Sequence, residues 1–377
     1  MLYLDHAASS PLRPEVLAAM APHLTGPVGN PSSHHTVGEA AAAVLSDARM
    51  RVARVLGMRA SDVVFTSGGT EANNLAMKGI VLAALESGHR HLITTAMEHE
   101  SLRASASYLR RFHGVEITLL PLGAHGRVEP DTLRGAVRED TALISLAHAN
   151  NEIGTVQDAT ALTAIAQEHR VPLHLDAVQS AGWLPLAGVG ADAISIAGHK
   201  LGAPQGIGAL IVRGRVPLEP LLHGGGQESG RRSGTENVAG AVGLATALEL
   251  AESEREDVAD RVRAATHSFI TEVLRLVPTA RLTGDPVHRL PATASFTIAG
   301  TSGESVLLEL ERRGVVSSSG SACAAGSDEP SPVLLALGIA PEVAHTSLRF
   351  TFGREQLSPD APLQLARLVA ESVAAVG

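Results

Sequence analysis

Short apolar runs alternate with helix-like stretches through residues 36–212, and this alternation constrains the fold more than any other feature of the chain. The runs predicted to be strands are 62–67, 91–95, 115–120, 142–147, 171–175, 192–196 and 207–212. The stretches predicted to be helices are 36–56, 74–87, 98–113 and 159–169. Such alternation implies a mainly parallel sheet with helices on both faces, in which ligands collect at the carboxyl ends of the strands.

The pattern changes after a charge-rich helical stretch at about 236–276. Strands predicted at 293–299 and 347–352 flank helices near 303–313 and 331–337. We therefore expect an α/β fold with a large domain over 12–250, and a smaller α+β domain formed by 1–11 and 251–377. Because aromatic residues make up only 2% of the chain, both cores must be built from Ala, Val, Leu and Ile.

Composition excludes several classes of function. The formal net charge of −9 argues against binding to nucleic acids or to anionic membranes. No uncharged apolar run is long enough to predict a membrane-spanning helix, and the first residues do not resemble a signal peptide. One cysteine cannot form an internal disulfide, which fits a reducing cytoplasm, and we expect no metal site.

Two reactive residue types are scarce. The chain has two lysines, Lys78 and Lys200, and one cysteine, Cys323, while arginine supplies most of the positive charge. A deprotonated lysine can form a Schiff base, whereas arginine cannot, and cysteine offers a nucleophilic thiolate. The lysine-poor composition itself is simply explained as compositional drift, but it draws attention to Lys200 in the sequence Ala-Gly-His-Lys.

Several polar groups follow predicted strands. Gly68, Gly69 and Thr70 join a strand to a helix and could bind a phosphate, although a plain turn explains them as well. Asn150, Asn151 and Glu152 follow the strand at 142–147 and could bind a carboxylate or a ring hydroxyl, or form a capped polar loop.

The next two strands end in groups with more specific chemistry. Asp176 ends one strand, with Gln179 three residues later, and His199 and Lys200 end the next. A carboxylate at a buried strand end needs a cation, and the nitrogen of a pyridinium ring is one such partner, although a helix cap is the simpler use of Asp176. Together, the carboxylate, the lysine and the glycine-rich turn predict a site for pyridoxal phosphate.

Two later segments complete the candidate site. Residues 224–237 are rich in glycine and arginine, which suits either anion binding or a flexible surface loop. Cys323 lies among Gly320, Ser321 and Gly326, and these small neighbours predict a mobile loop rather than a buried position. Such a thiol could reach a cofactor and then a partner protein.

With these motifs together, the chain resembles the cysteine desulfurases of the NifS/IscS type, within the class V aminotransferase family. The markers, spread over nearly the whole sequence, are Gly29-Asn-Pro-Ser-Ser, Phe65-Thr-Ser-Gly-Gly-Thr-Glu-Ala-Asn-Asn, Glu98-His99, Asn150-Asn-Glu-Ile-Gly, Asp176-Ala-Val-Gln, Gly198-His-Lys, Arg232-Ser-Gly-Thr and Ser318-Ser-Gly-Ser-Ala-Cys. The resemblance implies a fold-type I homodimer that converts L-cysteine to L-alanine and forms a persulfide on Cys323. The sulfur would then pass to an acceptor or scaffold protein, as in iron–sulfur cluster assembly.

The resemblance also implies roles for individual residues. Lys200 would hold pyridoxal phosphate, His99 would stack on its ring and move protons, and Asp176 would pair with the ring nitrogen. The other implied cofactor contacts are Gly69, Thr70, Asn151, Gln179, His199 and, reaching over from the second subunit, Thr235. Asn151 and Arg349 would bind the substrate carboxylate, and Cys323 would accept the sulfur.

Two positions depart from the family pattern, and other functions stay open. Ala197 stands where many relatives have a phosphate-binding serine, and His6 stands where asparagine or tyrosine is frequent.

A selenocysteine lyase, a transaminase or an epimerase would need Lys200 and Asp176 but not Cys323. A non-enzymatic sulfur-relay or scaffold subunit is disfavoured, because Asp176, His199, Lys200 and Cys323 are all present. A dinucleotide site is excluded because no Gly-x-Gly-x-x-Gly joins a first strand to a helix.

Overall fold

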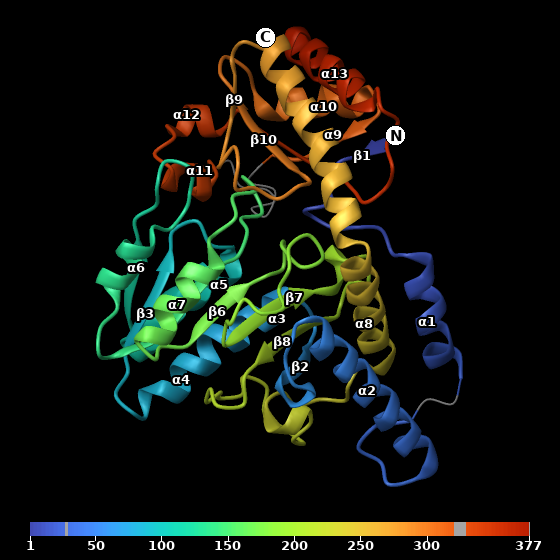
Figure 1. The fold of residues 1–377 in the computed structure, drawn as a ribbon, viewed down its shortest axis with the longest axis vertical. Coiled ribbons are helices and arrows are strands. Elements are labelled where there is room, and N and C mark those ends of the chain that lie inside the picture. The colour runs from blue at the N-terminus through green and yellow to red at the C-terminus, as the bar shows by residue number, and fades with distance from the viewer. Residues whose placement is uncertain (27–28, 320–328, 377) are drawn as a thin grey trace.

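A seven-stranded sheet forms the centre of the larger part of the molecule. The computed structural model describes residues 1–26, 29–319 and 329–376, and Figure 1 shows their arrangement. In spatial order the strands are β2 (Val63–Thr66), β8 (Gly208–Val212), β7 (Ala193–Ala197), β6 (Leu173–Asp176), β5 (Thr141–Ala147), β3 (His91–Thr95) and β4 (Glu116–Leu120). β8 runs antiparallel to both of its neighbours, and the other pairs are parallel. The expected mainly parallel sheet is confirmed.

Helices cover both faces of this sheet because successive strand residues point to opposite sides. Leu92 and Leu143 belong to the apolar cluster on one face, whereas their neighbours Ile93 and Ile144 belong to the cluster on the other. The first face is covered by α3 (Gly69–Asn74), α4 (Ile80–Leu85) and α5 (Glu100–His113). The second is covered by α1 (Pro14–Thr25), α2 (Thr36–Val55), α6 (Pro130–Ala136), α7 (Ala159–Glu168) and α8 (Val238–Ser253).

A smaller part with its own core is stacked on the larger one (Figure 1). Its antiparallel sheet has the order β12 (Ser347–Thr351), β10 (Thr293–Ile298), β9 (Ala280–Leu282). Its helices are α9 (Arg255–Leu276), α10 (Gly303–Arg312), α11 (Pro332–Ala336), α12 (Pro341–Ala344) and α13 (Ala361–Val376). The core of this part contains four phenylalanines that pack edge to face: Phe269, Phe296, Phe350 and Phe352. The expectation that it would be built from Ala, Val, Leu and Ile alone is therefore wrong.

The N-terminal segment joins the two parts. β1 (Leu2–Tyr3) pairs in parallel with β11 (Val315–Val316), and both chain ends lie in the smaller part (Figure 1). A few residues later, the Ala7 amide donates to Thr351 Oγ1 at 2.9 Å and the Ser10 amide donates to the His199 carbonyl at 2.8 Å. We propose that the two cores mark two domains with the predicted boundaries.

Two predicted helical stretches differ in detail. The one expected at 74–87 begins already at Gly69 and contains a wider, π-helical turn, Leu75–Gly79. The stretch at about 236–276 divides at Glu254 into α8 and α9. None of the helices in the described ranges combines the length and the apolar character needed to cross a bilayer.

Candidate active site

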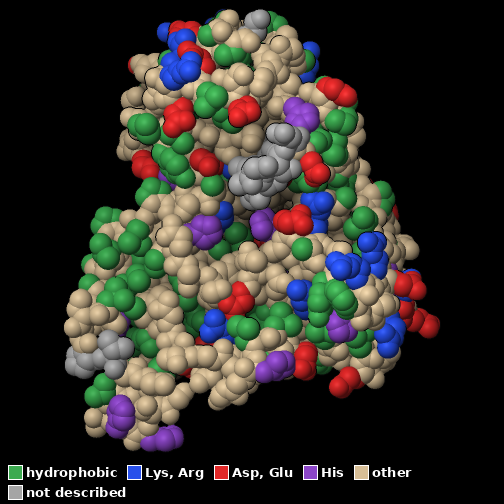
Figure 2. Space-filling view, turned by 180° about the vertical axis from the view of Figure 1, so that it is seen from behind, with side chains coloured by type: hydrophobic (Ala, Val, Ile, Leu, Met, Phe, Trp, Pro, Cys, Tyr) green, Lys and Arg blue, Asp and Glu red, His purple; other side chains and the backbone are tan. Residues whose placement is uncertain are grey.

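A cavity of about 430 Å³ opens beside the carboxyl ends of β6 and β7. Nine of the predicted site residues line it: Gly69, Thr70, His99, Asn151, Asp176, Gln179, His199, Lys200 and Arg349. Charged and histidine side chains gather at the boundary between the smaller and larger parts (Figure 2). The cavity therefore brings together groups from sequence positions that are far apart.

Asp176 ends β6 and is buried. Its Oδ2 accepts a hydrogen bond from Asn73 Nδ2 at 2.7 Å, and its Oδ1 accepts one from the Val178 amide at 2.9 Å. Burial raises the pKa of Asp176, while these two hydrogen bonds and the charge of Lys200 oppose the rise. A cation beside this carboxylate would offset its desolvation further.

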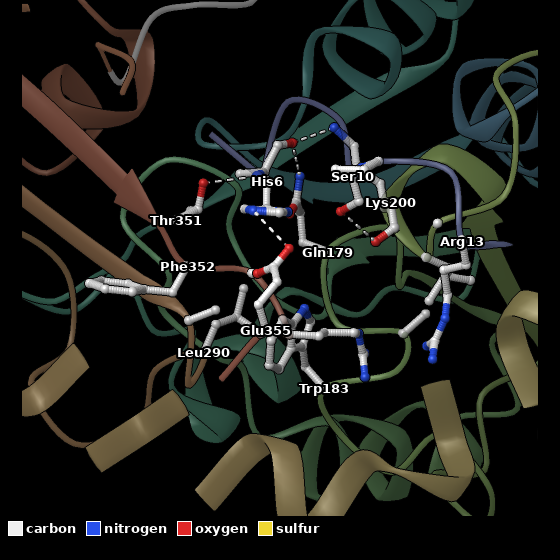
Figure 3. Close-up of a pocket in the computed structure, with 18 of the residues that line it drawn as sticks. His6, Ser10, Arg13, Gln179, Trp183, Lys200, Leu290, Thr351, Phe352 and Glu355 are labelled. Atoms are coloured by element: carbon white, nitrogen blue, oxygen red, sulfur yellow. Dashed lines mark hydrogen bonds and ion pairs between the residues drawn. The ribbon is translucent and has the colours of Figure 1, made fainter. Parts of the chain in front are cut away.

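Lys200 ends a short 3₁₀ turn, Gly198–Lys200, that follows β7. Its Nζ donates to the carbonyl of Ala8 at 2.7 Å and also to the carbonyl of Ala7. The Ala7 carbonyl accepts a second hydrogen bond, from Gln179 Nε2 at 3.0 Å. The N-terminal segment therefore runs directly beside the lysine, as the close-up in Figure 3 shows for the adjoining residues.

Two histidines line the same cavity. His99 is the N-cap of α5, and its Nδ1 accepts from the Ser101 amide at 3.1 Å, which places the proton of the neutral ring on Nε2. Burial, aided by the charge of Lys200, lowers the pKa of His199 to about 4. His199 is therefore neutral at physiological pH, so it can donate a hydrogen bond without adding a buried charge.

Gly69, the first residue of α3, leaves no room for a side chain, and Gly68 before it has a backbone conformation that favours glycine. A Cβ built on Gly69 would lie 2.7 Å from Val178 Cγ2 and 3.3 Å from the Cβ of Ala197, and Gly68 has a φ of 153°. Ala197 therefore lies directly against the glycine turn, so a phosphate there would lose the hydroxyl that a serine offers, worth about 1 kcal/mol.

Arg349 enters the cavity from β12 and is 2% exposed. Its Nη2 donates to Asp5 Oδ1 at 2.7 Å, and its Nη1 donates to the Asn151 carbonyl at 3.0 Å. Its Nε is buried without a hydrogen-bond partner in the part of the chain that the structure describes. The guanidinium thus keeps a donor for a further acceptor, such as a carboxylate.

These residues fit pyridoxal phosphate. Asp176 suits a ring cation, Lys200 supplies an amine, and the glycine turn can receive a phosphate. In addition, Asn73 Oδ1 is buried beside Asp176 and accepts no hydrogen bond from the described residues. A buried acceptor and a buried carboxylate at one cavity both favour a polar ligand that carries positive charge.

A second cavity of about 310 Å³ shares Ala7, Val178, Gln179 and Lys200 with the first. Figure 3 shows His6, Thr351 and Glu355 meeting at its wall. The His6 ring lies 3.9 Å from a Glu355 oxygen. Burial lowers the pKa of His6, and Glu355 opposes that shift. The unusual histidine therefore faces this neighbouring cavity.

One predicted residue lies away from the cavity, one lies outside the described residues, and two residues that orient or border the site were given no role from the sequence. Thr235 is exposed on the loop before α8 and does not line the cavity, and Cys323 lies outside the described residues. Asn73, which orients Asp176, belongs to the family marker that begins at Phe65 and lies one turn after the glycines, but neither signal gave it a role. Glu98 is buried and accepts hydrogen bonds from Thr95 Oγ1 and the Ala147 amide, both at 2.7 Å.

The chain is similar to known proteins over nearly its whole length. Residues 2–360 match the model of the family described as Aminotransferase class-V. A cysteine desulfurase IscS from Dictyoglomus turgidum is 44% identical over 93% of this chain and 89% of its own length. An IscS-like cysteine desulfurase from Mycobacterium tuberculosis is 42% identical over 97% and 94%.

Solved structures agree with these sequence matches. A NifS-like protein has a TM-score of 0.91 and 31% identity, covering 100% of both chains. A structure described as SspA in complex with cysteine has a TM-score of 0.82 and 34% identity, covering 95% of this chain and all of the other. The similarity thus extends through both parts of the molecule.

Proposed function

The chain belongs to the class-V aminotransferase family, and on that premise we propose that it is a pyridoxal-phosphate-dependent cysteine desulfurase. It converts L-cysteine to L-alanine and transfers the sulfur to Cys323. The observation that carries this proposal is the single cavity lined by Lys200, Asp176 and Arg349. Its relatives named as cysteine desulfurases, 44% and 42% identical to it, support the same function.

The cofactor would be held by residues that line the cavity of about 430 Å³. Lys200 would bind it covalently, Asp176 would keep a proton on the ring nitrogen, and His99 would stack on the ring. The phosphate would lie at the glycine turn, near Gly69, Thr70, and neutral His199, and Gln179 would contact the ring hydroxyl. When bound, pyridoxal phosphate withdraws electrons from the amino acid and so makes its Cα proton easier to remove.

Arg349 and Asn151 would orient the substrate. The Nε of Arg349 has no hydrogen-bond partner among the described residues and would donate to the substrate carboxylate, while its other two nitrogens are held by Asp5 and by the Asn151 carbonyl. Lys200 Nζ would then take the Cα proton of the bound cysteine as a general base. Because Arg349 is anchored on two sides, it can fix the substrate's position with little loss of its own freedom.

Cys323 would act as the sulfur acceptor. Its thiolate would attack the substrate sulfur, forming an S–S bond as the substrate's Cβ–S bond breaks. The electron pair of the broken bond stays with the carbon fragment, which takes up protons and leaves as alanine. An unperturbed cysteine has a pKa of about 8.5, so forming the thiolate requires a base. His99 would accept the thiol proton at Nδ1, the nitrogen that carries no proton, and would give up its hydrogen bond from the Ser101 amide to do so.

We also propose the wider setting of this enzyme. It would act as a cytoplasmic homodimer and pass sulfur to a separate acceptor protein. Thr235 supports the dimer, because it is exposed and lies off the cavity of its own chain, as expected of a residue that serves a second copy. Co-purification with the persulfide form would identify this acceptor.

The decisive experiment follows the sulfur. L-cysteine is added to the purified yellow protein, and both alanine in solution and the mass of Cys323 are measured. We expect one alanine for each sulfur atom gained on Cys323. Cys323→Ala should keep the yellow absorbance but release no sulfide. Steady sulfide production by that variant would rule out the acceptor role.

A further inference from the structure

Glu152 is a buried carboxyl at the edge of the candidate site that the proposed mechanism does not use. It is 7% exposed and directly follows Asn151 in the chain. Asn150 fixes this turn, because its Oδ1 accepts from the amides of Glu152 and Ile153 at 2.9 and 3.0 Å. The Glu152 carboxyl thus stands at a defined place beside the proposed carboxylate-binding group.

The partner of Glu152 is Ser331, from a distant part of the sequence. The Ser331 hydroxyl is buried and donates to Glu152 Oε2. The same hydroxyl accepts from the Leu334 amide at 3.2 Å, so it is also the N-cap of α11. One hydroxyl therefore ties the start of this short helix to the turn that carries Asn151.

Apolar contacts strengthen this attachment. Val333 and Leu334 of α11 belong to a small buried cluster with Met97 and Ile153 of the larger part. Ile153 is the residue next to Glu152, so the polar and apolar contacts act on the same turn. The chain that leaves residue 328 is thus attached to the larger part within a few residues.

The chain that enters the same segment is attached at a different point. Ser318 forms an antiparallel bridge with Arg349, in which the Ser318 amide donates to the Arg349 carbonyl at 3.1 Å and the Arg349 amide donates back at 2.6 Å. Arg349 in turn donates to the Asn151 carbonyl. One flank of segment 320–328 is therefore tied to Arg349, and the other is tied to Glu152, the residue that directly follows Asn151.

We propose that Glu152 is a positioning residue that, through Ser331, sets where the chain bearing Cys323 rejoins the described structure relative to the bound substrate. This inference rests on the proposed function. Burial raises the pKa of Glu152 to about 7, and the hydrogen bond from Ser331 opposes this rise. The charges of Arg349, Arg103 and His99 also favour the ionised form. Burying the ionised Glu152 carboxylate costs free energy, and the hydrogen bond that it accepts from Ser331 offsets part of that cost.

The test separates substrate binding, proton removal and sulfur transfer. Glu152→Ala, Glu152→Gln and Ser331→Ala are compared with the parent, all with the cofactor bound. Binding is followed by the absorbance change on adding L-cysteine, and proton removal by deuterium uptake at Cα in heavy water. Sulfur transfer is followed by the mass of Cys323 in a single turnover.

We expect Glu152→Ala and Ser331→Ala to leave binding and deuterium uptake within twofold of the parent, and to slow sulfur transfer at least about tenfold. Glu152→Gln keeps an acceptor oxygen and should recover much of the rate. Ser302→Ala is the matched control, because Ser302 is the exposed N-cap of α10 and its loss should change none of the three.

Other outcomes would overturn the inference. Sulfur transfer at the parent rate in both Glu152→Ala and Ser331→Ala would do so, and so would an equal fall in all three measurements, which indicates general damage. If Glu152→Ala does not fold, Ser331→Ala and Glu152→Gln decide alone. A parent protein that forms no persulfide would instead contradict the proposed function itself.

Discussion

The large and small sheets contribute to the same cavity in opposite ways. The large sheet ends in many polar groups, among them Asp176 and Lys200, whose side chains reach the cavity from neighbouring strands. Among the described residues of 251–377, only Arg349 lines it. That arginine is almost fully buried and tied on two sides. The large sheet thus supplies the proposed chemistry, and the small sheet supplies one rigid anchor for the substrate.

The strongest test of this division is Lys200→Ala. Loss of the amine removes both the covalent link to the cofactor and the base for the Cα proton, so alanine release should fall at least about a thousandfold. Lys200→Arg is the matched control, because it keeps the positive charge but cannot form a Schiff base. Alanine release at the parent rate in either variant would remove Lys200 from the mechanism.

Arg349→Lys tests the anchor from the small sheet. A lysine cannot donate to Asp5, to the Asn151 carbonyl and to a substrate at once, so the KM for L-cysteine should rise at least about tenfold, with a smaller effect on kcat. Steady-state kinetics measure both constants. Arg281→Lys, at an exposed position of β9, serves as the control and should leave them unchanged. An unchanged KM in Arg349→Lys would place substrate binding elsewhere.

The same contrast explains what the sequence could predict. Asp176 and Lys200 end neighbouring parallel strands, and the ends of parallel strands meet at one edge of a sheet, so their proximity follows from local patterns. The ion pair between Arg349 and Asp5 joins residues 344 positions apart, and no local pattern encodes it. The role given to Arg349 came from family resemblance alone.

Some parts of the site depend on packing that sequence patterns do not reveal. Asn73 reaches Asp176 because α3 lies against the strand ends, an approach set by the glycines that allow close contact. Glu98 is part of the family marker Glu98-His99, which does not reveal that its side chain is buried. The burial follows from the pairing of β3 with β5, which brings the Ala147 amide to the Glu98 carboxyl. The boundaries predicted for the two domains stay a prediction.

Glu98→Gln tests the buried acid of the large sheet. Burial, reinforced by the charge of Asp176, raises the pKa of Glu98 to about 8, above its unfolded value of 4.5. The native state then keeps a proton that the unfolded state loses, so stability falls as pH rises between these values. From pH 6 to 8 the parent should lose about 2 kcal/mol relative to Glu98→Gln.

This comparison is made by urea unfolding of cofactor-free protein at both pH values. Glutamine also loses one acceptor for Thr95 or Ala147, but that cost does not change with pH, so only the difference in slope matters. If the free energy of unfolding changes equally with pH in the two proteins, Glu98 is ionised in the native state, and its hydrogen-bonding neighbours offset the cost of burying its charge.

Phe269→Leu should have the smallest effect and tests whether the two sheets belong to separate domains. The Phe269 ring is fully buried, with its centroid 5.1 Å from Phe350 and 5.6 Å from Phe352. Losing these edge-to-face contacts should cost about 1–2 kcal/mol, with turnover nearly unchanged. Calorimetry should then show one of two transitions moving down, whereas Ile165→Val in the large core should move the other by about 1 kcal/mol. A single transition that moves with both substitutions would show instead that the two cores unfold as one cooperative unit, despite their different contributions to the cavity.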